Sequence, residues 1–380
     1  MIIDNYEYDI TNYNHPGGSV INYLNGQDAT NAFQEFHYRS KKALMILKSL
    51  PRKKRVVEDK ELEDFQNFRR SLEERGFFNP SSIHIMYRIT ELVFLYGLSI
   101  LATTYNIWLS VLLFGFFGAK CGWLQHEAGH NSFTGDIKTD KRIQNAAIGF
   151  GLCIDGSMWN SMHNTHHAAT QKIGHDVDLN TAPLVVFHNS KEKFSRPIQL
   201  WLRYQKYTFI PITSGILVMM YWVFYLHPRK IIQDKNISQA TIVIAGHALR
   251  IFFMKGVVYH IISLWITGMY MFGHFSLSHT FTPTVSIDEN PNWVRYAIEH
   301  TVDIEPDNKW VGWLMGYLNN QVIHHLFPSM PQYRGPEVVK ELNIFCKKWD
   351  IKYRQVGYFE AWNLMFQNLE DVGKNVKLSK

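Results

Sequence analysis

The chain is poor in cysteine. Its three cysteines, Cys121, Cys153 and Cys346, lie far apart and form no C-x-x-C pair. Their number and spacing indicate neither a disulfide framework nor a thiolate metal site, and we expect a reducing, cytosol-facing active region. We also expect no N-terminal signal peptide, because the first 40 residues are polar. We therefore expect any membrane insertion to use internal segments.

The chain also lacks the marks of a nucleic-acid-binding protein. It has a net charge of +6 and an isoelectric point near 9.0, but no zinc-finger spacing, RNA-binding signature or long basic stripe. Aromatic residues make up 14% of the sequence, and such abundance fits membrane interfaces. The charge therefore favours an anionic membrane surface as the partner, and no nucleic acid is expected.

Long apolar segments are present although the mean hydropathy is only −0.18. Residues 89–123 are too long for one span of about 20 residues, so they predict two helices hinged near residues 104–106. Residues 207–226 predict a third span, and residues 251–272 predict a fourth. We therefore expect a mostly α-helical integral membrane protein with four transmembrane helices in two hairpins.

The distribution of Lys and Arg predicts the orientation in the membrane. Most of these residues lie in segments 1–88, 120–206 and 273–380, which the positive-inside rule places in the cytosol together with both termini. The loop 228–250 would then be luminal, although it begins with several basic residues. Asn236 in this loop starts an N-I-S glycosylation sequon, which matters only if the loop is luminal.

A charged stretch separates the first 50 residues from the first span. Residues 48–64 are rich in charged side chains, and their apolar residues show no regular spacing. This is typical of a solvated linker, and a lipid-binding patch is the alternative. Phe65, Phe68 and Leu72 then recur at helical spacing until the "GFFNPS" segment ends the pattern. We predict an amphipathic helix that lies on the membrane.

Histidine is abundant: the chain has 18, and seven of them lie in three short clusters. The clusters are His126 and His130 in "HEAGH", His163, His166 and His167 in "HNTHH", and His324 and His325 in "QVIHH", which opens with Gln321. Spacings of three or four bring imidazoles to one side of a helix. Each cluster lies just outside a predicted span, so we interpret these histidines as metal ligands in a cytosolic cap.

The first cluster alone does not identify the metal. His126-Glu127-Ala128-Gly129-His130 fits the H-E-x-x-H pattern of zinc metalloproteases. A catalytic zinc takes about three protein ligands and a water, which would leave the other clusters idle. Imidazoles in this number suffice for two metals, and neutral nitrogen ligands hold iron while leaving positions for oxygen. A two-iron centre is therefore favoured, with a membrane zinc protease as the distant alternative.

The boxes H-x-x-x-H, H-x-x-H-H and Q-x-x-H-H, in this order around two apolar hairpins, resemble those of the membrane fatty acid desaturase family. Gln321, which opens the third box, resembles the front-end desaturases in particular. The similarity runs from about residue 60 to the C-terminus. Glu127 is a departure, because relatives commonly have aspartate after the first histidine. We interpret Glu127 as a residue that surrounds the metal ligands rather than as the base of a protease.

The resemblance implies one more iron ligand between the last span and the third box. This position corresponds best to His279, whereas we interpret His274 as structural. Gln321 either coordinates through its amide oxygen or holds a bridging water. His300, in "HTVDI", has no assigned role. Acceptors for the histidine N–H groups are expected among nearby polar residues such as Asp176, Asp178, Asn164 and Asn320.

A further metal is indicated near the N-terminus. In His15-Pro16-Gly17-Gly18, proline fixes one dihedral angle and the glycines allow close approach of a flat ligand. With "GQDATNAF" and His37 in "EFHYRS", this segment closely resembles a cytochrome b5 domain. The resemblance implies that His15 and His37 bind the iron of haem b from both faces, so that the haem passes electrons. Relatives have additional residues before this part, so either the true start lies upstream or the domain is N-terminally shortened. A domain that no longer holds haem is the further alternative.

The two resemblances predict three regions: residues 1–55 as a small α+β haem domain, 56–88 as a linker and surface helix, and 89–380 as the desaturase domain. They imply an O2-dependent enzyme of the endoplasmic reticulum that introduces a cis double bond into polyunsaturated acyl chains. The substrate would be an acyl-CoA or a phospholipid, and electrons would come from NAD(P)H through a separate cytochrome b5 reductase.

The position of the new double bond is less determined, because it depends on the shape of the acyl-binding site. We favour delta-5 or delta-4 activity and leave delta-6 open. A delta-8 sphingoid-base desaturase and a di-iron acyl hydroxylase are the nearer alternatives. A non-catalytic haem-binding or lipid-binding membrane protein is a more distant one.

Overall fold

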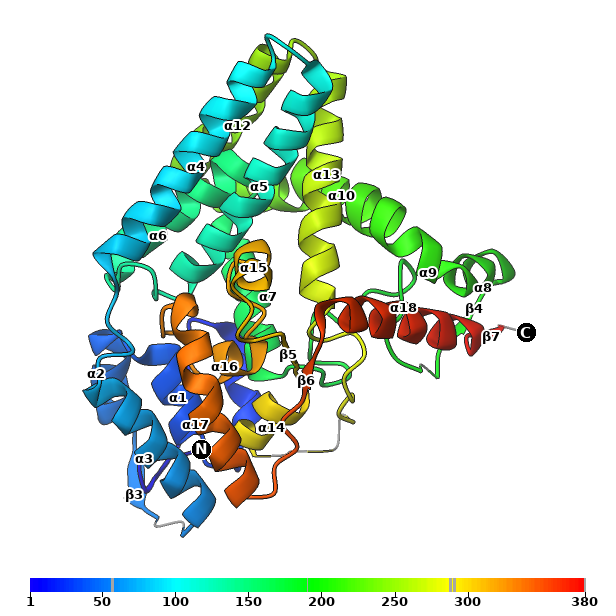
Figure 1. Ribbon diagram of the computed structural model, residues 1–380. Helices are drawn as coiled ribbons and strands as arrows, with labels where there is room; N and C mark the ends of the chain where they lie inside the picture. The colour runs from blue at the N-terminus through cyan, green and yellow to red at the C-terminus, as the bar shows by residue number, and fades with distance from the viewer. Residues whose placement is uncertain (56–57, 190, 287–288, 290–291, 379–380) are drawn as a thin grey trace.

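The structure, a computed structural model, describes residues 1–55, 58–189, 191–286, 289 and 292–378. It is mostly helical, as the sequence predicts. Figure 1 shows long helices gathered at one end of the molecule, with shorter helices and the N-terminal segment at the other. Residues 56 and 57, where the predicted second region begins, lie outside the described residues.

The first predicted hairpin is confirmed. It consists of α4 (Ser82–Ala102) and α5 (Ile107–Gly129). The chain turns at residues 103–106, where the Asn106 side chain accepts the backbone N–H groups of Trp108 and Leu109 at 2.9 and 3.1 Å and so caps α5. Among the described residues, four helical segments are long and apolar enough to cross a membrane: Ser82–Ala102, Ile107–Gly129, Gln205–Gln233 and Ile237–Met254.

The second hairpin differs from the predicted one. It is formed by α12 (Ile237–Met254) and α13 (Val257–Ser276). The predicted span 251–272 is interrupted because Lys255, with a left-handed φ of 54°, and Gly256 end α12. Most of the expected loop 228–250 is helical instead. In Figure 1, α4, α5, α12 and α13 lie together as one bundle.

The predicted third span, 207–226, belongs to one longer helical segment. Its parts are α9 (Gln205–Thr208), η3 (Phe209–Val218), α10 (Met219–Tyr221), η4 (Trp222–Leu226) and α11 (His227–Gln233). Both η3 and η4 are π-helical, and η3 contains Pro211, which has no N–H for a regular helical bond. The Pro211 carbonyl accepts the indole N–H of Trp265 at 2.7 Å. In Figure 1 this segment leaves the bundle at an angle.

Two glycines let α5 and α13 approach closely. A Cβ atom at Gly115 would lie 2.6 Å from the Ile266 side chain, and one at Gly118 would lie 2.7 Å from Oγ1 of Thr267. The Thr267 hydroxyl donates to the Gly115 carbonyl at 2.9 Å. Helices in lipid associate mainly by such close packing and by interhelical hydrogen bonds. The contact fixes α5, and therefore the position of its C-terminal end.

Residues 1–55 form an α+β unit. Its antiparallel sheet has the order β1 (Ile2–Ile3), β2 (Tyr6–Tyr8) and β3 (Arg52–Lys54), and its helices are η1 (Gly18–Leu24), α1 (Thr30–His37) and α2 (Lys41–Ser49). Asp4 and Asn5 turn β1 into β2 with φ values of 48° and 63°, which suits the twist of a two-residue hairpin. Ile3, Tyr8 and Leu47 are buried in its small core.

The helix predicted to lie on the membrane packs inside the protein instead. In α3 (Lys60–Glu74), Phe65 and Leu72 are 0% exposed, and the Phe65 ring stacks on Phe327 with centroids 5.5 Å apart. An apolar stripe at helical spacing fits any apolar surface, and the protein provides one here. That surface comes from α14 (Trp293–Glu299), α16 (Gln321–Leu326) and α17 (Gly335–Lys348), with η5 (Gln332–Arg334) between the last two.

The remaining elements complete the fold. They are α6 (Ile137–Ala146), η2 (Ala147–Leu152), α7 (Gly156–Ala168), β4 (Lys193–Phe194), α8 (Arg196–Arg203), β5 (Asp303–Ile304), α15 (Lys309–Leu314), β6 (Gln355–Val356), α18 (Tyr358–Lys374) and β7 (Lys377–Leu378). The pairs β4–β7 and β5–β6 are parallel. Lys206 and Glu370 form an ion pair of 2.6 Å that joins α9 to α18.

We predict that Gly118→Ala destabilises the protein and that Gly97→Ala does not. The new methyl group at Gly118 meets Thr267 at 2.7 Å and the Gly151 carbonyl at 3.0 Å, whereas Gly97 has open space around it. Overpacking of this kind costs about 1–3 kcal/mol. Thermal unfolding followed by tryptophan fluorescence in detergent should show a lower Tm for Gly118→Ala only. Equal Tm values would contradict the close contact.

Candidate metal centre

The three histidine boxes lie on three helices that approach one another below the bundle. His126 is in the last turn of α5, and His130 ends that helix. The second box occupies the last turns of α7, and the third lies in α16. Asp155 fixes the start of α7 by accepting the backbone N–H of Met158 at 2.7 Å. Figure 1 shows α7 and α16 near the lower end of α5.

Five imidazoles form the first group. They are His126, His130, His163, His167 and His324, and one ring nitrogen of each lies within 4.8 Å of the others. Their Nε2 atoms are in contact in series, at 2.9 Å from His130 to His163, 3.0 Å from His163 to His167, and 3.1 Å from His167 to His324. A neutral ring has only one N–H, so nitrogens gathered around a common centre are arranged as ligands of one metal.

Three imidazoles form the second group, namely His166, His279 and His325, again within 4.8 Å of one another. His279 comes from the segment after α13, where the sequence predicts an additional ligand. The side-chain amide of Gln321 lies 3.1 Å from Nε2 of His279. The rings of His167 and His325 stack with centroids 4.1 Å apart, so the two groups are direct neighbours.

The spacing within the boxes explains the division into two groups. Residues four apart on a helix point the same way, so His163 and His167 both join the first group. Adjacent residues point about 100° apart, so His166 diverges from His167, and His325 diverges from His324. Each doubled histidine therefore supplies one ring to each group.

Outer hydrogen bonds determine which nitrogen of two rings faces the second group. His166 donates from Nδ1 to Asp176 at 3.0 Å. The hydroxyl of Thr170 donates to the His166 carbonyl at 2.8 Å, so its oxygen is left to accept Nδ1–H of His325 at 3.1 Å. In both rings Nδ1 is engaged, and Nε2 is the atom left for a metal.

Gln332 engages Nδ1 of His126 in the first group, as Asp176 and Thr170 do for the rings of the second. Its amide nitrogen lies 2.6 Å from Nδ1 of His126, and its amide oxygen has no hydrogen-bond partner among the described residues. Turning the amide over exchanges the two atoms, which lets the oxygen accept Nδ1–H. Nε2 of His126, which also has no partner within the described part of the chain, is then the ligand atom.

Burial keeps most of the rings neutral, so that they offer a lone pair. It lowers the pKa of His130 to about 3 and holds the pKa of His325 far below its usual value. His166 differs: burial lowers its pKa, but Asp176 and Asp178 outweigh burial and raise it to about 9. The two carboxylates therefore favour a positive charge at His166, either on the protonated ring or on a metal ion that takes the place of its proton.

The donor set fits two metals and does not fit a zinc protease. Imidazole suits iron, zinc, copper and nickel, and eight rings in groups of five and three exceed what one catalytic zinc uses. The carboxylate of Glu127 is buried, and it accepts N–H groups from His84 at 3.0 Å and from the backbone of Gln332 at 3.3 Å. With both contacts made, Glu127 is not free to activate a water molecule.

Two of the four polar residues expected to accept N–H groups from the histidines do so, and two do not. Asp176 and Asp178 contact His166 as expected, at 3.0 and 3.3 Å. Asn164 is exposed, however, and Asn320 donates to a backbone carbonyl rather than accepting from a histidine. His274 is bonded at both ring nitrogens, to a backbone carbonyl and to a tyrosine hydroxyl, in accord with its predicted structural role.

The "HTVDI" segment anchors the third box, a role that the sequence analysis missed. Asp303 accepts the backbone N–H of Val322 at 2.7 Å and the hydroxyl of Tyr353. Val322 is the second residue of α16, so the carboxylate holds the start of that helix. His300 bonds instead to the Pro283 carbonyl. No spacing rule reveals the Asp303 contact, because its partners are distant in the chain.

In the N-terminal unit, His15 and His37 face each other. Their ring centroids are 6.0 Å apart. This is about the span of two imidazoles bound on opposite sides of one metal atom at about 2 Å each. A Cβ atom at Gly17 would lie 2.9 Å from the His15 ring, and Gly18 has a φ of 76°, so both positions favour glycine. The pair fits a haem iron without an open position.

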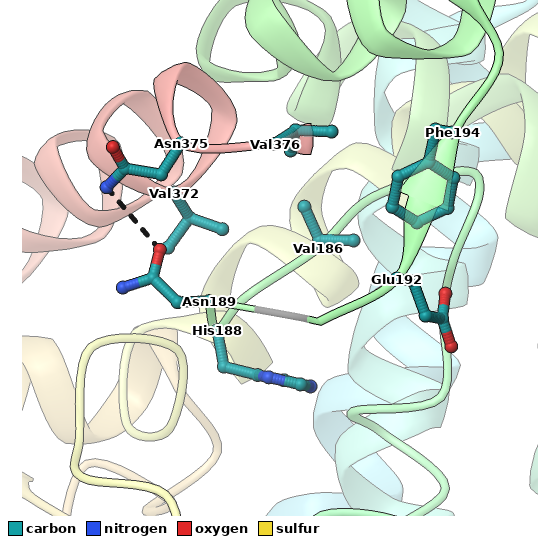
Figure 2. Close-up of a pocket in the computed structure, with 8 residues that line it drawn as sticks. All are labelled: Val186, His188, Asn189, Glu192, Phe194, Val372, Asn375 and Val376. Atoms are coloured by element: carbon teal, nitrogen blue, oxygen red, sulfur yellow. Dashed lines mark hydrogen bonds between the residues drawn. The ribbon is translucent and has the colours of Figure 1, made fainter. Parts of the chain in front are cut away.

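A small cleft lies between residues 186–189 and 192–194 on one side and the end of α18 on the other (Figure 2). Its lining includes Val186, Phe194 and Val372, and Asn375 donates to Asn189 at 3.5 Å across it. No member of either histidine group lines this cleft. It is therefore separate from the candidate metal centre.

Fold and site together fit a membrane protein that combines a candidate metal centre of eight histidines with a cytochrome-like unit. The family described as Fatty acid desaturase matches residues 102–357, and the Cytochrome b5-like Heme/Steroid binding domain matches residues 1–67. The chain belongs to the fatty acid desaturase family, and it is a front-end desaturase with a fused cytochrome b5 domain.

Its relatives agree with this assignment. An acyl-lipid (8-3)-desaturase of Rebecca salina is 38% identical, over 98% of this chain and 91% of the relative. An enzyme of the same name from Thraustochytrium sp is 36% identical, over 99% and 92%. The Delta(6)-fatty-acid desaturase fat-3 of Caenorhabditis elegans is 26% identical, over 96% and 93%.

We predict that Asp303→Ala lowers both stability and iron content. It leaves the N–H of Val322 and the hydroxyl of Tyr353 without their acceptor, at about 1–3 kcal/mol each. Asp303→Asn keeps one oxygen acceptor and should lose less. Metal analysis and Tm of the purified variants test this, with Asp307→Ala as an exposed control. Wild-type iron content in Asp303→Ala would contradict the anchoring role.

Proposed function

We propose that the enzyme introduces a cis double bond at carbon 5 of a polyunsaturated acyl chain, with carbon 4 as the next choice and carbon 6 open. The observation that carries the desaturase assignment is the gathering of eight imidazoles in two adjacent groups. The relatives named (8-3)-desaturases support carbon 5. We interpret that name as a double bond placed three carbons nearer the carboxyl end than an existing one at carbon 8.

We propose that each imidazole group holds one iron ion. Bound iron would supply O2 activation and the removal of hydrogen from an unactivated carbon pair, which side-chain acid–base chemistry does not achieve. The first iron would be held by the five rings of the first group, and the second by His166, His279 and His325. Gln321, beside His279, either completes that site or orients a water. The rest of the chain positions the acyl group and excludes bulk water.

We further propose the predicted regions 1–55, 56–88 and 89–380 as the haem domain, the connecting segment and the desaturase domain. Haem b would be held by His15 and His37, and its electrons would come from NAD(P)H through a separate flavoprotein reductase. Helices α7 and α16, which carry two of the histidine boxes, and α1 of the N-terminal unit lie at the same end of the bundle (Figure 1), which supports a single cytosolic side. The expected location is the endoplasmic reticulum membrane, and the acyl carrier is phospholipid or CoA.

Expression in yeast tests this function directly. Cultures are fed C18 to C22 polyunsaturated acids, and new double bonds are located by mass spectrometry. We expect a new double bond at carbon 5 in a chain already unsaturated at carbon 8. The product should disappear in His324→Ala, whose ring belongs to the first group, and persist in His188→Ala, which belongs to neither group.

Three outcomes would change the proposal. A product at carbon 4 or carbon 6 would correct the position of the double bond. An alcohol in place of an alkene would overturn desaturation in favour of hydroxylation. Product formation that survives His324→Ala would remove the histidine groups from the reaction.

A further inference from the structure

The haem unit is docked on the rest of the protein through buried charges. Glu35 of α1 pairs with Arg69 of α3, and both side chains are at most 2% exposed. The hydroxyl of Ser329, just beyond the third box, donates to Glu35 at 3.2 Å. The two contacts hold α1 in one geometry against α3 and against the segment that follows the third box. The unit therefore has a defined orientation relative to the histidine groups.

At the docked face, one ring from each side takes part in a parallel stack. Tyr23 lies in η1, which begins at Gly18 of the haem turn. Its ring stacks on that of His175, with centroids 4.3 Å apart and planes inclined by only 4°. His175 is followed in the chain by Asp176, whose carboxylate accepts Nδ1–H of His166 at 3.0 Å.

This stack leads directly into the second imidazole group. From Tyr23 the path crosses one ring contact to His175, follows the backbone to Asp176, and crosses one hydrogen bond to His166. Asp176 is held rigidly, because it also accepts the backbone N–H groups of Gln171 at 2.7 Å and of Asp178 at 2.9 Å.

Another ring contact across the same face is weaker. The ring centroids of Phe36 and Trp293 are 6.4 Å apart, and the two ring planes are inclined by 59°. The indole N–H of Trp293 has no hydrogen-bond partner among the described residues, so this contact does not continue through a hydrogen bond. Electron transfer decays steeply across gaps and less steeply through bonded or touching atoms. The stack of Tyr23 on His175 is therefore the better connection.

We propose that the Tyr23–His175 stack is the contact through which the haem unit passes electrons to the second imidazole group. The inference rests on the proposed function and specifies how its two metal sites are connected. In each transfer one ferrous haem held by His15 and His37 would become ferric, and iron held by the second group would take up the electron. No bond forms or breaks, and neither ring gains or loses a proton. Tyr23 and His175 touch neither metal nor substrate, so they are positioning residues.

The test uses the full-length enzyme, loaded with haem and iron, in lipid nanodiscs. The haem is reduced with dithionite without oxygen and then mixed with O2 and an acyl substrate that the wild type desaturates. Haem oxidation is followed by its visible absorbance. Tyr23→Leu and His175→Ala are each expected to slow the substrate-dependent phase about tenfold, equivalent to about 1.4 kcal/mol in the barrier. Tyr23→Phe and His175→Phe keep a ring in the stack and should stay close to wild type.

A double-mutant cycle tests whether the two residues act through one contact. The combined Tyr23→Leu/His175→Ala variant should be no slower than either single variant, because both remove the same interaction. Haem reduction by the reductase, the haem spectrum and the iron content should not change, whereas a merely structural defect would alter them. Tyr105→Leu and His188→Ala are the matched controls, since Tyr105 is 82% exposed and His188 lies in the separate cleft.

Wild-type haem oxidation in both single variants would overturn the inference. Slow oxidation in Trp293→Leu alone would also overturn it, because it would move the connection to the Phe36 contact. If Tyr23→Leu or His175→Ala loses haem or iron, the test rests on Tyr23→Phe and His175→Phe. Slow haem oxidation in these two variants would contradict the role of the stack. Absence of substrate-dependent haem oxidation in the wild type would count against the proposed function itself, so the two failures are distinguishable.

Discussion

Eight imidazoles have to be held within a few ångströms of one another at the end of a membrane bundle, and no single segment can supply them. Each box contributes two or three rings, so the ends of α5, α7 and α16 must meet. The close approach of α5 to α13 at Gly115 and Gly118 fixes one of these ends. Asp155 and Asp303 fix the starts of the other two helices by accepting backbone N–H groups. Much of the polar structure near the site is explained by this requirement.

The neutrality of the rings depends on a balance of burial and charge. Desolvation disfavours the protonated form of each ring, and this leaves the lone pairs free for metals. Two metal cations would in turn be unfavourable among uncharged rings alone. Asp176 and Asp178 supply negative charge next to His166, and Asp176 also selects the nitrogen that His166 presents. One carboxylate thus contributes to both charge balance and ligand orientation.

The sequence predicted the parts of the molecule that depend on local spacing. The hinge of the first hairpin follows from a polar Thr-Tyr-Asn break in an apolar run, and the histidine boxes follow from helical periodicity. Contacts between distant segments were not predictable in this way. The apolar stripe of Phe65 and Leu72 is equally compatible with a membrane and with a protein core, and only the position of α16 and α17 decides between them. The second hairpin was misplaced because a Lys255-Gly256 break is short enough to be overlooked between apolar residues.

The same limit explains why H-E-x-x-H is ambiguous as a sequence. In this chain His84 comes from α4 and Gln332 from η5, and together they occupy the carboxylate of Glu127. His126 and His130 are completed by rings from two other helices instead of by a water molecule and one further ligand. The motif therefore determines the geometry of two imidazoles, while the residues that surround it determine the chemistry. The hydrogen bond between His84 and the buried Glu127 links the start of α4 to the end of α5, where the first histidine box lies. It therefore joins the first span to the candidate metal centre.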